Sequence, residues 1–181
     1  RGLGDVYKRQ GESLAVKLSD FADVSERIQY LVTQVEEITK IDNFGAYLTA
    51  MLEIDAFFMN EDRHTNNIAV IYNEKTQKYE LSPFFDQGLC MFADINQDYP
   101  IDQSLEYCLE KIEAKPFSSD FDIQLDAAEE LYGIQIGFQF TFKDIQIYLQ
   151  KNSENYPREV IRRVEQLLRG QMRKYGYLMK K

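Results

Sequence analysis

Hydrophobic positions in the first half of the chain change from a helical to an extended pattern. Apolar residues recur every three or four positions after residue 25, at Ile28, Leu31, Val32, Val35 and Ile38. This spacing predicts an amphipathic helix with Asp23 or Ser25 as its N-cap. A second apolar stripe follows the break at 41–43 and covers 44–58. We expect these two helices to pack as a pair.

The helical period stops before residue 61, where a polar string begins. Residues 61–67 read Glu-Asp-Arg-His-Thr-Asn-Asn and lead directly into the apolar run 68–72, which predicts a β-strand. Residues 73–77 have turn chemistry, and 78–82 alternate as a returning strand. The sequence therefore predicts a helix, a polar loop and a β-hairpin in that order.

The second half of the chain predicts more helices. The candidate helices are 104–113, 123–132, 143–151 and 158–177. We find no internal repeat and no low-complexity segment. The expected fold class is mainly α with a small β-hairpin, that is, α+β.

Composition supports a cored globular chain. The 181 residues are 44% hydrophobic and carry a net charge of −9, and no run reaches the ~18 apolar residues of a membrane span. An acidic balance argues against direct nucleic-acid binding, which needs a surplus of Lys and Arg. Cys90 and Cys108 fit a reducing compartment better than a disulfide framework. We expect a cytoplasmic protein without a membrane partner.

Charge is unevenly distributed along the chain. Residues 158–181 hold eight basic and two acidic side chains, a local charge of +6, so the rest of the chain carries −15. A basic last helix of this kind is usually a solvated face, and an anionic partner is the alternative.

The first ten residues do not resemble the start of a domain. Residues 1–10 have neither apolar periodicity nor the apolar core of a signal peptide. Residues 5–10 resemble the translation of a common sequencing-library adapter. We therefore expect 1–10 to be a non-native leader and 11–181 to be the domain.

The polar loop and the end of the hairpin together form a candidate site. Asn67 stands at the entrance of the predicted hairpin and Asp86 just beyond its exit, so the hairpin can bring them together. Amide and carboxylate oxygens suit a hard cation such as Mg²⁺. Asp62 lies beside them and can accept a proton from an attacking hydroxyl. These are the parts of a phosphoryl-transfer site.

Two motifs resemble one kinase family. Asp62-Arg63-His64-Thr65-Asn66-Asn67 resembles the catalytic loop of HipA-like serine/threonine kinases, where an Asp and a His two residues on are followed by Asn at +5. The segment 79–86 resembles that family's next motif, a strand followed by Pro, aromatic residues and a metal-binding Asp. The first motif also occurs in phosphatidylinositol 3- and 4-kinases, and residues 86–88 are similar to the Asp-Phe-Gly of protein kinases. The resemblance covers about 11–177.

This resemblance implies the C-lobe of a protein-kinase-like fold and assigns the site residues. Asp62 would be the catalytic base, and Asn67 and Asp86 would hold Mg²⁺ and with it ATP. His64 would brace the catalytic loop. Arg63 would pair with an acid or a phosphorylated partner.

Structural roles compete with these assignments. Asp62 alone could be a turn residue and Asn67 a strand cap, because both types are common in loops. His64 could in principle be a general base or a zinc ligand, but zinc needs three or four suitable ligands. A structural His64 held through one ring nitrogen is the favoured alternative. Asp55, inside the second apolar stripe, is expected to be a buried hydrogen-bonding residue.

The N-lobe of a kinase is not recognisable in the sequence. Residues 14–17 read Leu-Ala-Val-Lys and superficially resemble the Val-Ala-Ile-Lys lysine motif, but the interval from Lys17 to Asp62 is too short for the remaining N-lobe. We expect a C-lobe without its N-lobe. The parent protein would transfer the ATP γ-phosphoryl group, and this chain alone would have little or no activity.

The acceptor and partners are expectations of the same resemblance. A protein Ser or Thr is the preferred acceptor, and a small antitoxin-like partner is possible in this family. The rivals are a pseudokinase or regulatory module that binds a partner through the basic last helix, and a lipid kinase. Acidic residues follow Asp86 before any basic one, at Asp94, Asp98, Asp102, Glu106 and Glu110. They would repel an inositol phosphate.

Overall fold

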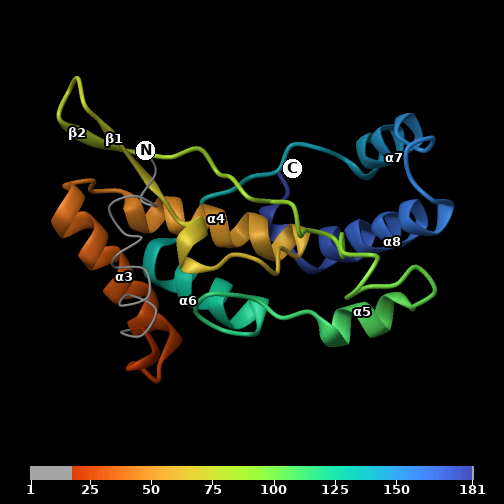
Figure 1. Cartoon of the computed structure of the whole chain (residues 1–181), viewed down its shortest axis with the longest axis horizontal. Helices are drawn as coiled ribbons and strands as arrows, with labels where there is room; N and C mark the ends of the chain where they lie inside the picture. Colours follow the sequence, from red (N-terminus) through yellow and green to blue (C-terminus); the bar gives the residue numbers. More distant parts are fainter. Residues whose placement is uncertain (1–17, 181) are drawn as a thin grey trace.

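Helix α4 (Phe44–Phe58) is the central element of the fold. Its buried side chains point in nearly every direction around the axis, and Phe44, Leu48 and Phe57 are fully buried. A helix that is apolar on all sides must be enclosed by its neighbours. Helices α3, α6 and α8 pack against it (Figure 1). The core of the molecule therefore surrounds α4.

The structure, a computed structural model, describes residues 18–180. Within this range α4 is joined by the helices α3 (Val24–Thr39), α5 (Leu105–Lys111), α6 (Phe121–Tyr132), α7 (Phe142–Lys151) and α8 (Arg158–Lys174). One antiparallel hairpin consists of β1 (Val70–Asn73) and β2 (Lys78–Leu81), and two short 3₁₀ turns are Thr65–Asn67 and Gly176–Leu178. The expected mainly helical class with a small hairpin is confirmed.

Helix ends follow the capping chemistry of the sequence. Asp23 caps α3 by accepting from the backbone N–H of Glu26 at 3.1 Å, as expected. The N-terminus of α4 has no cap from Asn43. Instead Glu36 of α3 accepts from the backbone N–H of Phe44 at 3.0 Å. The two helices are thus joined at the point where the chain turns between them.

The expected pair of α3 and α4 is completed by a third helix. Helix α6 packs against both of them. A side-chain carbon at Gly45 of α4 would lie 2.5 Å from the ring of Tyr132 in α6, so only glycine permits this close approach. The hydroxyl of Thr49 donates across the same interface to the carbonyl of Ala128 at 3.3 Å. This contact lies between residues far apart in the sequence, which hydrophobic periodicity does not reveal.

The hairpin is shorter than expected and stands away from the body. Its register pairs Val70 with Leu81 and Asn73 with Lys78. Strand β1 begins at Val70 instead of residue 68 because the preceding residues form a 3₁₀ turn and a buried connection. Only the end near Val70 is buried, and the tip projects into solvent (Figure 1). The chain therefore enters and leaves the hairpin at its base, close in sequence to Asn67 and Asp86.

Basic helix α8 serves the interior as well as the surface. Arg163 is buried and donates to the backbone carbonyls of Tyr99, Pro100, Ile101 and Gln103. Gln171 donates to the last carbonyls of α4, at Ala56 and Phe57. The helix ends at Lys174 instead of the expected residue 177, and the 3₁₀ turn begins at Gly176.

Two expectations lie outside the described residues. These are the non-native leader at 1–10 and the lysine motif at 14–17. In the range 18–180, no helix combines the length and the apolar character needed to cross a bilayer.

Glu53 of α4 gives the fold a measurable pH dependence. It is fully buried and accepts from the backbone N–H groups of Gln135 at 2.8 Å and Ile136 at 2.6 Å. Burial raises the pKa of Glu53 from 4.5 to about 6, against the effect of these two bonds. Between these values only the folded state keeps the proton, so the free energy of unfolding falls as the pH rises through this window.

We predict that wild-type protein loses up to about 2 kcal/mol of stability relative to Glu53→Gln between pH 4.5 and pH 7. Glutamine cannot ionise and removes this contribution. Urea unfolding of both proteins at the two pH values measures the difference. A difference that does not change with pH would contradict the assignment.

Candidate functional site

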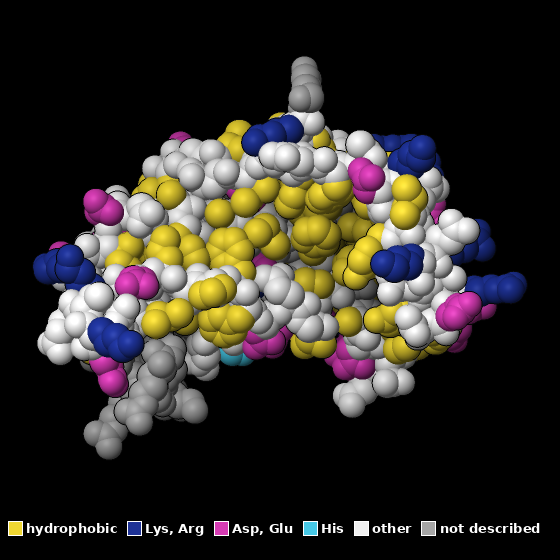
Figure 2. Space-filling view, turned by 90° about the horizontal axis from the view of Figure 1, so that it is seen from above, with side chains coloured by type: hydrophobic (Ala, Val, Ile, Leu, Met, Phe, Trp, Pro, Cys, Tyr) yellow, Lys and Arg dark blue, Asp and Glu magenta, His cyan; other side chains and the backbone are white. Residues whose placement is uncertain are grey.

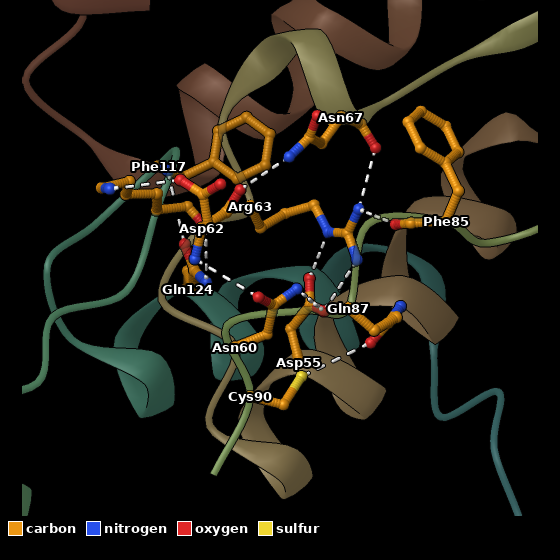
Figure 3. A network of polar contacts seen from close by, with 11 residues as sticks. Asp55, Asn60, Asp62, Arg63, Asn67, Phe85, Gln87, Cys90, Phe117 and Gln124 are labelled. Carbon is orange, nitrogen blue, oxygen red and sulfur yellow. Dashed lines mark hydrogen bonds and ion pairs between the residues drawn. The ribbon is translucent and has the colours of Figure 1, made fainter. Parts of the chain in front are cut away.

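A buried ion pair connects helix α4 to the polar loop. Arg63 and Asp55 are both fully buried, with Nε to Oδ2 at 2.6 Å and Nη2 to Oδ1 at 3.0 Å. Asn60 donates to the same carboxylate at 2.8 Å (Figure 3). Burial raises the pKa of Asp55, and the bonds from Arg63 and Asn60 oppose that rise. The expected roles of Asp55 as a buried hydrogen-bonding residue and of Arg63 as partner of an acid are confirmed.

The remaining nitrogen of Arg63 joins the two ends of the hairpin. Its Nη1 donates to the backbone carbonyl of Asn67 at 2.9 Å and to that of Phe85 at 3.0 Å (Figure 3). Asn67 precedes the hairpin and Phe85 precedes Asp86 directly. One guanidinium therefore brings the backbone at both candidate metal ligands to the same point.

Asn67 is oriented by the loop that precedes it. The residue is buried at the end of the 3₁₀ turn, and its side-chain Nδ2 donates to the backbone carbonyl of Asp62 at 2.9 Å. Its backbone N–H donates to the carbonyl of His64 at 2.8 Å. Because the amide nitrogen donates this hydrogen bond, Oδ1 is the atom of the side chain that can coordinate a cation or accept a hydrogen bond.

Asp86 is exposed and has a strained backbone. Its φ of 58° lies in the left-handed region, which costs most residues about 1 kcal/mol or more and which Asp tolerates better than most. Met91 and Phe92 of the following segment are also left-handed. Met91 is held by a bond from its N–H to the carbonyl of Phe58 at 2.9 Å. In the described part of the chain, the Asp86 carboxylate makes no hydrogen bond or ion pair. Strain of this kind is typical of functional sites.

The Asp62 carboxylate lies between two basic groups. Lys115 Nζ is 3.7 Å from Oδ1, and His64 Nε2 is 3.8 Å from Oδ2. Both distances exceed those of hydrogen bonds, and the side chain is 29% exposed. The carboxylate therefore keeps lone pairs free for an incoming hydroxyl.

His64 does not hold the loop by a hydrogen bond. Its Nδ1 is buried and has no partner among the described residues, and Nε2 has only the long contact to Asp62. The expected contact of one ring nitrogen with a backbone or carboxylate group is present only as this long contact to the Asp62 carboxylate. Arg63 braces the loop instead, because a guanidinium offers several fixed donors and an imidazole offers at most two.

The donor set at the hairpin suits Mg²⁺ better than a transition metal. Within residues 18–180 no group of three or more His, Cys, Asp and Glu side chains is placed to hold a metal ion. The candidate ligands at the hairpin are Asn67 and Asp86. One amide oxygen and one carboxylate match the few protein ligands of Mg²⁺, which completes its shell with water and phosphate oxygens. The residues therefore fit this ion.

Sequence reasoning missed two residues that shape the loop. Lys115 approaches Asp62 from the segment between α5 and α6. Glu61 accepts a short hydrogen bond from the hydroxyl of Tyr99. Burial raises the pKa of Glu61. Both contacts join segments distant in sequence, and no local pattern marks them.

An apolar concavity lies beside the segment that follows Asp86. Two pockets of about 350 and 370 Å³ share Met91, Tyr148, Leu149 and Val164. Figure 2 shows hydrophobic side chains gathered across the hollowed face seen from above. Cys90 lines the larger pocket, but burial raises the pKa of its thiol to about 12, so it is a poor nucleophile. The titratable groups of interest are therefore those around Asp62.

Comparison of the chain with protein-family models, curated proteins and solved structures finds no match to any of them.

We predict that Arg63→Met lowers the free energy of unfolding by about 3–5 kcal/mol, because Asp55 is left charged and unpaired in the interior. Arg162→Met, at an exposed position of α8, is the control and should change stability by less than about 0.5 kcal/mol. Denaturant unfolding measures both. Equal effects of the two substitutions would show that the buried pair does not stabilise the fold.

Proposed function

We propose that this chain is the C-lobe of an ATP- and Mg²⁺-dependent phosphotransferase of the HipA-like type. The observation that supports the proposal most is the pair of hydrogen bonds that Arg63 Nη1 donates to the backbone carbonyls of Asn67 and Phe85. These two bonds hold the backbone of Asn67 and of the residue before Asp86 to one guanidinium, which belongs to the same loop as Asp62. A base next to an Asn and Asp pair is the arrangement that phosphoryl transfer requires.

Each residue has a separate role in this proposal. Asn67 and Asp86 hold Mg²⁺, which supplies neutralising charge to the phosphate oxygens of ATP. Asp62 orients the acceptor hydroxyl and takes its proton as the oxygen forms a bond to the γ-phosphorus. The bond to the bridging oxygen breaks, and ADP leaves with that electron pair. Arg63 contributes by positioning the loop.

A protein hydroxyl is the acceptor that fits best. Asp98, Asp102, Glu106 and Glu110 are exposed after the metal-binding segment, and among them Asp98 is paired, with Lys111 at 2.9 Å. This surface would repel an anionic membrane that carries the inositol lipid. Within the proposal, a Ser or Thr of a protein is therefore preferred to a lipid.

The regulatory alternative depends on the basic last helix. Several basic side chains of that helix contact other residues of this chain. Arg163 is buried, Lys174 pairs with Asp122 at 2.6 Å, and Arg169 lies 4.0 Å from the ring centre of Phe142. Fewer cations than the sequence count remain to dock an anionic partner. This observation favours the enzyme over the binding module.

We predict that Asp86→Asn weakens Mg²⁺-dependent binding of ATP to the full-length protein by at least about tenfold, because a charged oxygen ligand is lost. Asparagine also tolerates a positive φ, so the backbone is preserved. Titration calorimetry measures the affinity. Asp102→Asn, at an exposed position, is the control, and an equal effect of both substitutions would contradict the metal role.

We predict that the full-length protein transfers ³²P from γ-labelled ATP and that Asp62→Asn lowers the rate by about 10²–10⁴-fold, as loss of a general base does. The isolated 181-residue chain should show little or no transfer. No transfer by the full-length protein, with Asp62→Asn indistinguishable from wild type, would overturn the proposal. Rapid turnover by the isolated chain would overturn the expectation that it is incomplete.

A further inference from the structure

A pocket of about 330 Å³ opens beside Asp62. Among its lining residues are Arg27, His64, Thr65 and Lys115. None of the described residues that line it is acidic. In a chain whose first 157 residues carry a charge of −15, two permanent cations and an imidazole around one pocket stand out. The pocket therefore favours an anionic group.

The pocket is continuous with the catalytic carboxylate. Two of its lining side chains, Lys115 and His64, lie 3.7 and 3.8 Å from the two oxygens of Asp62. A group bound between them would lie next to the proposed base. The unpartnered Nδ1 of His64 belongs to the same ring.

Arg27 supplies a cation that is already held in place. Its Nε donates to the carbonyl of Phe21 at 2.8 Å and its Nη1 to that of Phe117 at 2.7 Å. These bonds use two of the five N–H donors of a guanidinium. An anion in the pocket would meet an ordered charge and would lose less entropy on binding than with a flexible side chain.

The position of the pocket separates it from the candidate metal ligands. Figure 3 shows Phe117 close to Asp62 in one part of the view and Phe85 in the opposite part. Lys115 and Pro116 of the pocket directly precede Phe117, whereas Asp86 directly follows Phe85. In phosphoryl transfer the attacking oxygen and the leaving group lie roughly in line on opposite sides of the phosphorus. An acceptor that approached Asp62 from the side of Lys115 would leave the side of Asn67 to the nucleotide.

We propose that this pocket is an acceptor-binding site that selects a protein segment with an acidic side chain close to the reacting hydroxyl. Lys115 and Arg27 bind the carboxylate, and the hydroxyl then lies within reach of Asp62. The inference rests on the proposed function and adds the substrate class. It assigns Lys115 to recognition of the acceptor and not of the nucleotide.

The test is an NMR titration of the ¹⁵N-labelled 181-residue chain with two peptides, Glu-Glu-Ser-Glu-Glu and Gln-Gln-Ser-Gln-Gln. We expect the acidic peptide to shift the signals of His64 and Thr65 and the neutral one to leave them unchanged. Lys115→Gln should lower the affinity for the acidic peptide by about 3- to 5-fold, which is the effect of losing a half-exposed ion pair. Lys143→Gln, on α7 and away from the lining residues, is the control and should bind as wild type does.

Asp62→Asn gives an opposite and diagnostic signature. Removing a negative charge beside the pocket should strengthen binding of the acidic peptide. The same substitution should slow phosphoryl transfer by the full-length protein about 10²–10⁴-fold. Equal binding of the two peptides, or no effect of Lys115→Gln, would overturn the proposal. A phosphoserine peptide that binds while the glutamate peptide does not would also overturn it.

The full-length protein distinguishes this proposal from the proposed function. If Lys115→Gln weakens binding of Mg²⁺·ATP as strongly as Asp86→Asn does, the pocket binds the nucleotide and the acceptor assignment is wrong. If the acidic peptide binds as expected but no phosphoryl transfer occurs, the pocket stands as a peptide site and the kinase proposal fails.

Discussion

The buried ion pair between Asp55 and Arg63 is the constraint on which the site depends. Two charges removed from water are costly unless every donor and acceptor is engaged. Here the guanidinium also binds the carbonyls of Asn67 and Phe85, and Asn60 binds the carboxylate. The pair is thus anchored in the central helix and fixes two segments that hydrophobic packing alone would leave free. Its partners specify geometry more than they contribute stability.

Residues with structural and with functional roles differ in how fully they are bonded. Arg63 makes bonds through all three of its nitrogens, whereas Asp86 has no side-chain partner in the described chain and Asp62 has only long contacts. Unsatisfied polar groups and left-handed residues cost free energy and persist where the surrounding structure holds them. The weakly bonded carboxylates of Asp62 and Asp86 and the left-handed backbone of Asp86 are the physical reason to look for chemistry at this loop and hairpin.

The sequence predicted the elements well and the long-range contacts poorly. Hydrophobic period located α3 because it buries one stripe, and the change to an extended pattern located the hairpin. Helix α4 was located because its apolar residues form one segment between two polar breaks. Local spacing also indicated that Asn67 and Asp86 flank a hairpin. The close approach of Gly45 to Tyr132 and the contact of Lys115 with Asp62 join distant segments, so no local pattern encodes them. The motif did not show that Arg63 makes most of the hydrogen bonds of the loop, because a motif identifies residue types but not which of them bonds.

The most direct test of the account is paramagnetic broadening by Mn²⁺, which replaces Mg²⁺ at oxygen sites, in the NMR spectrum of the ¹⁵N-labelled chain. The central claim is that Arg63 makes Asn67 and Asp86 one cation site beside Asp62. The account predicts that low Mn²⁺ concentrations broaden the amide signals of Asn67 and Asp86 first and leave those of Asp102 and Glu106 sharp. Broadening confined to the acidic surface, with Asn67 unaffected, would contradict it.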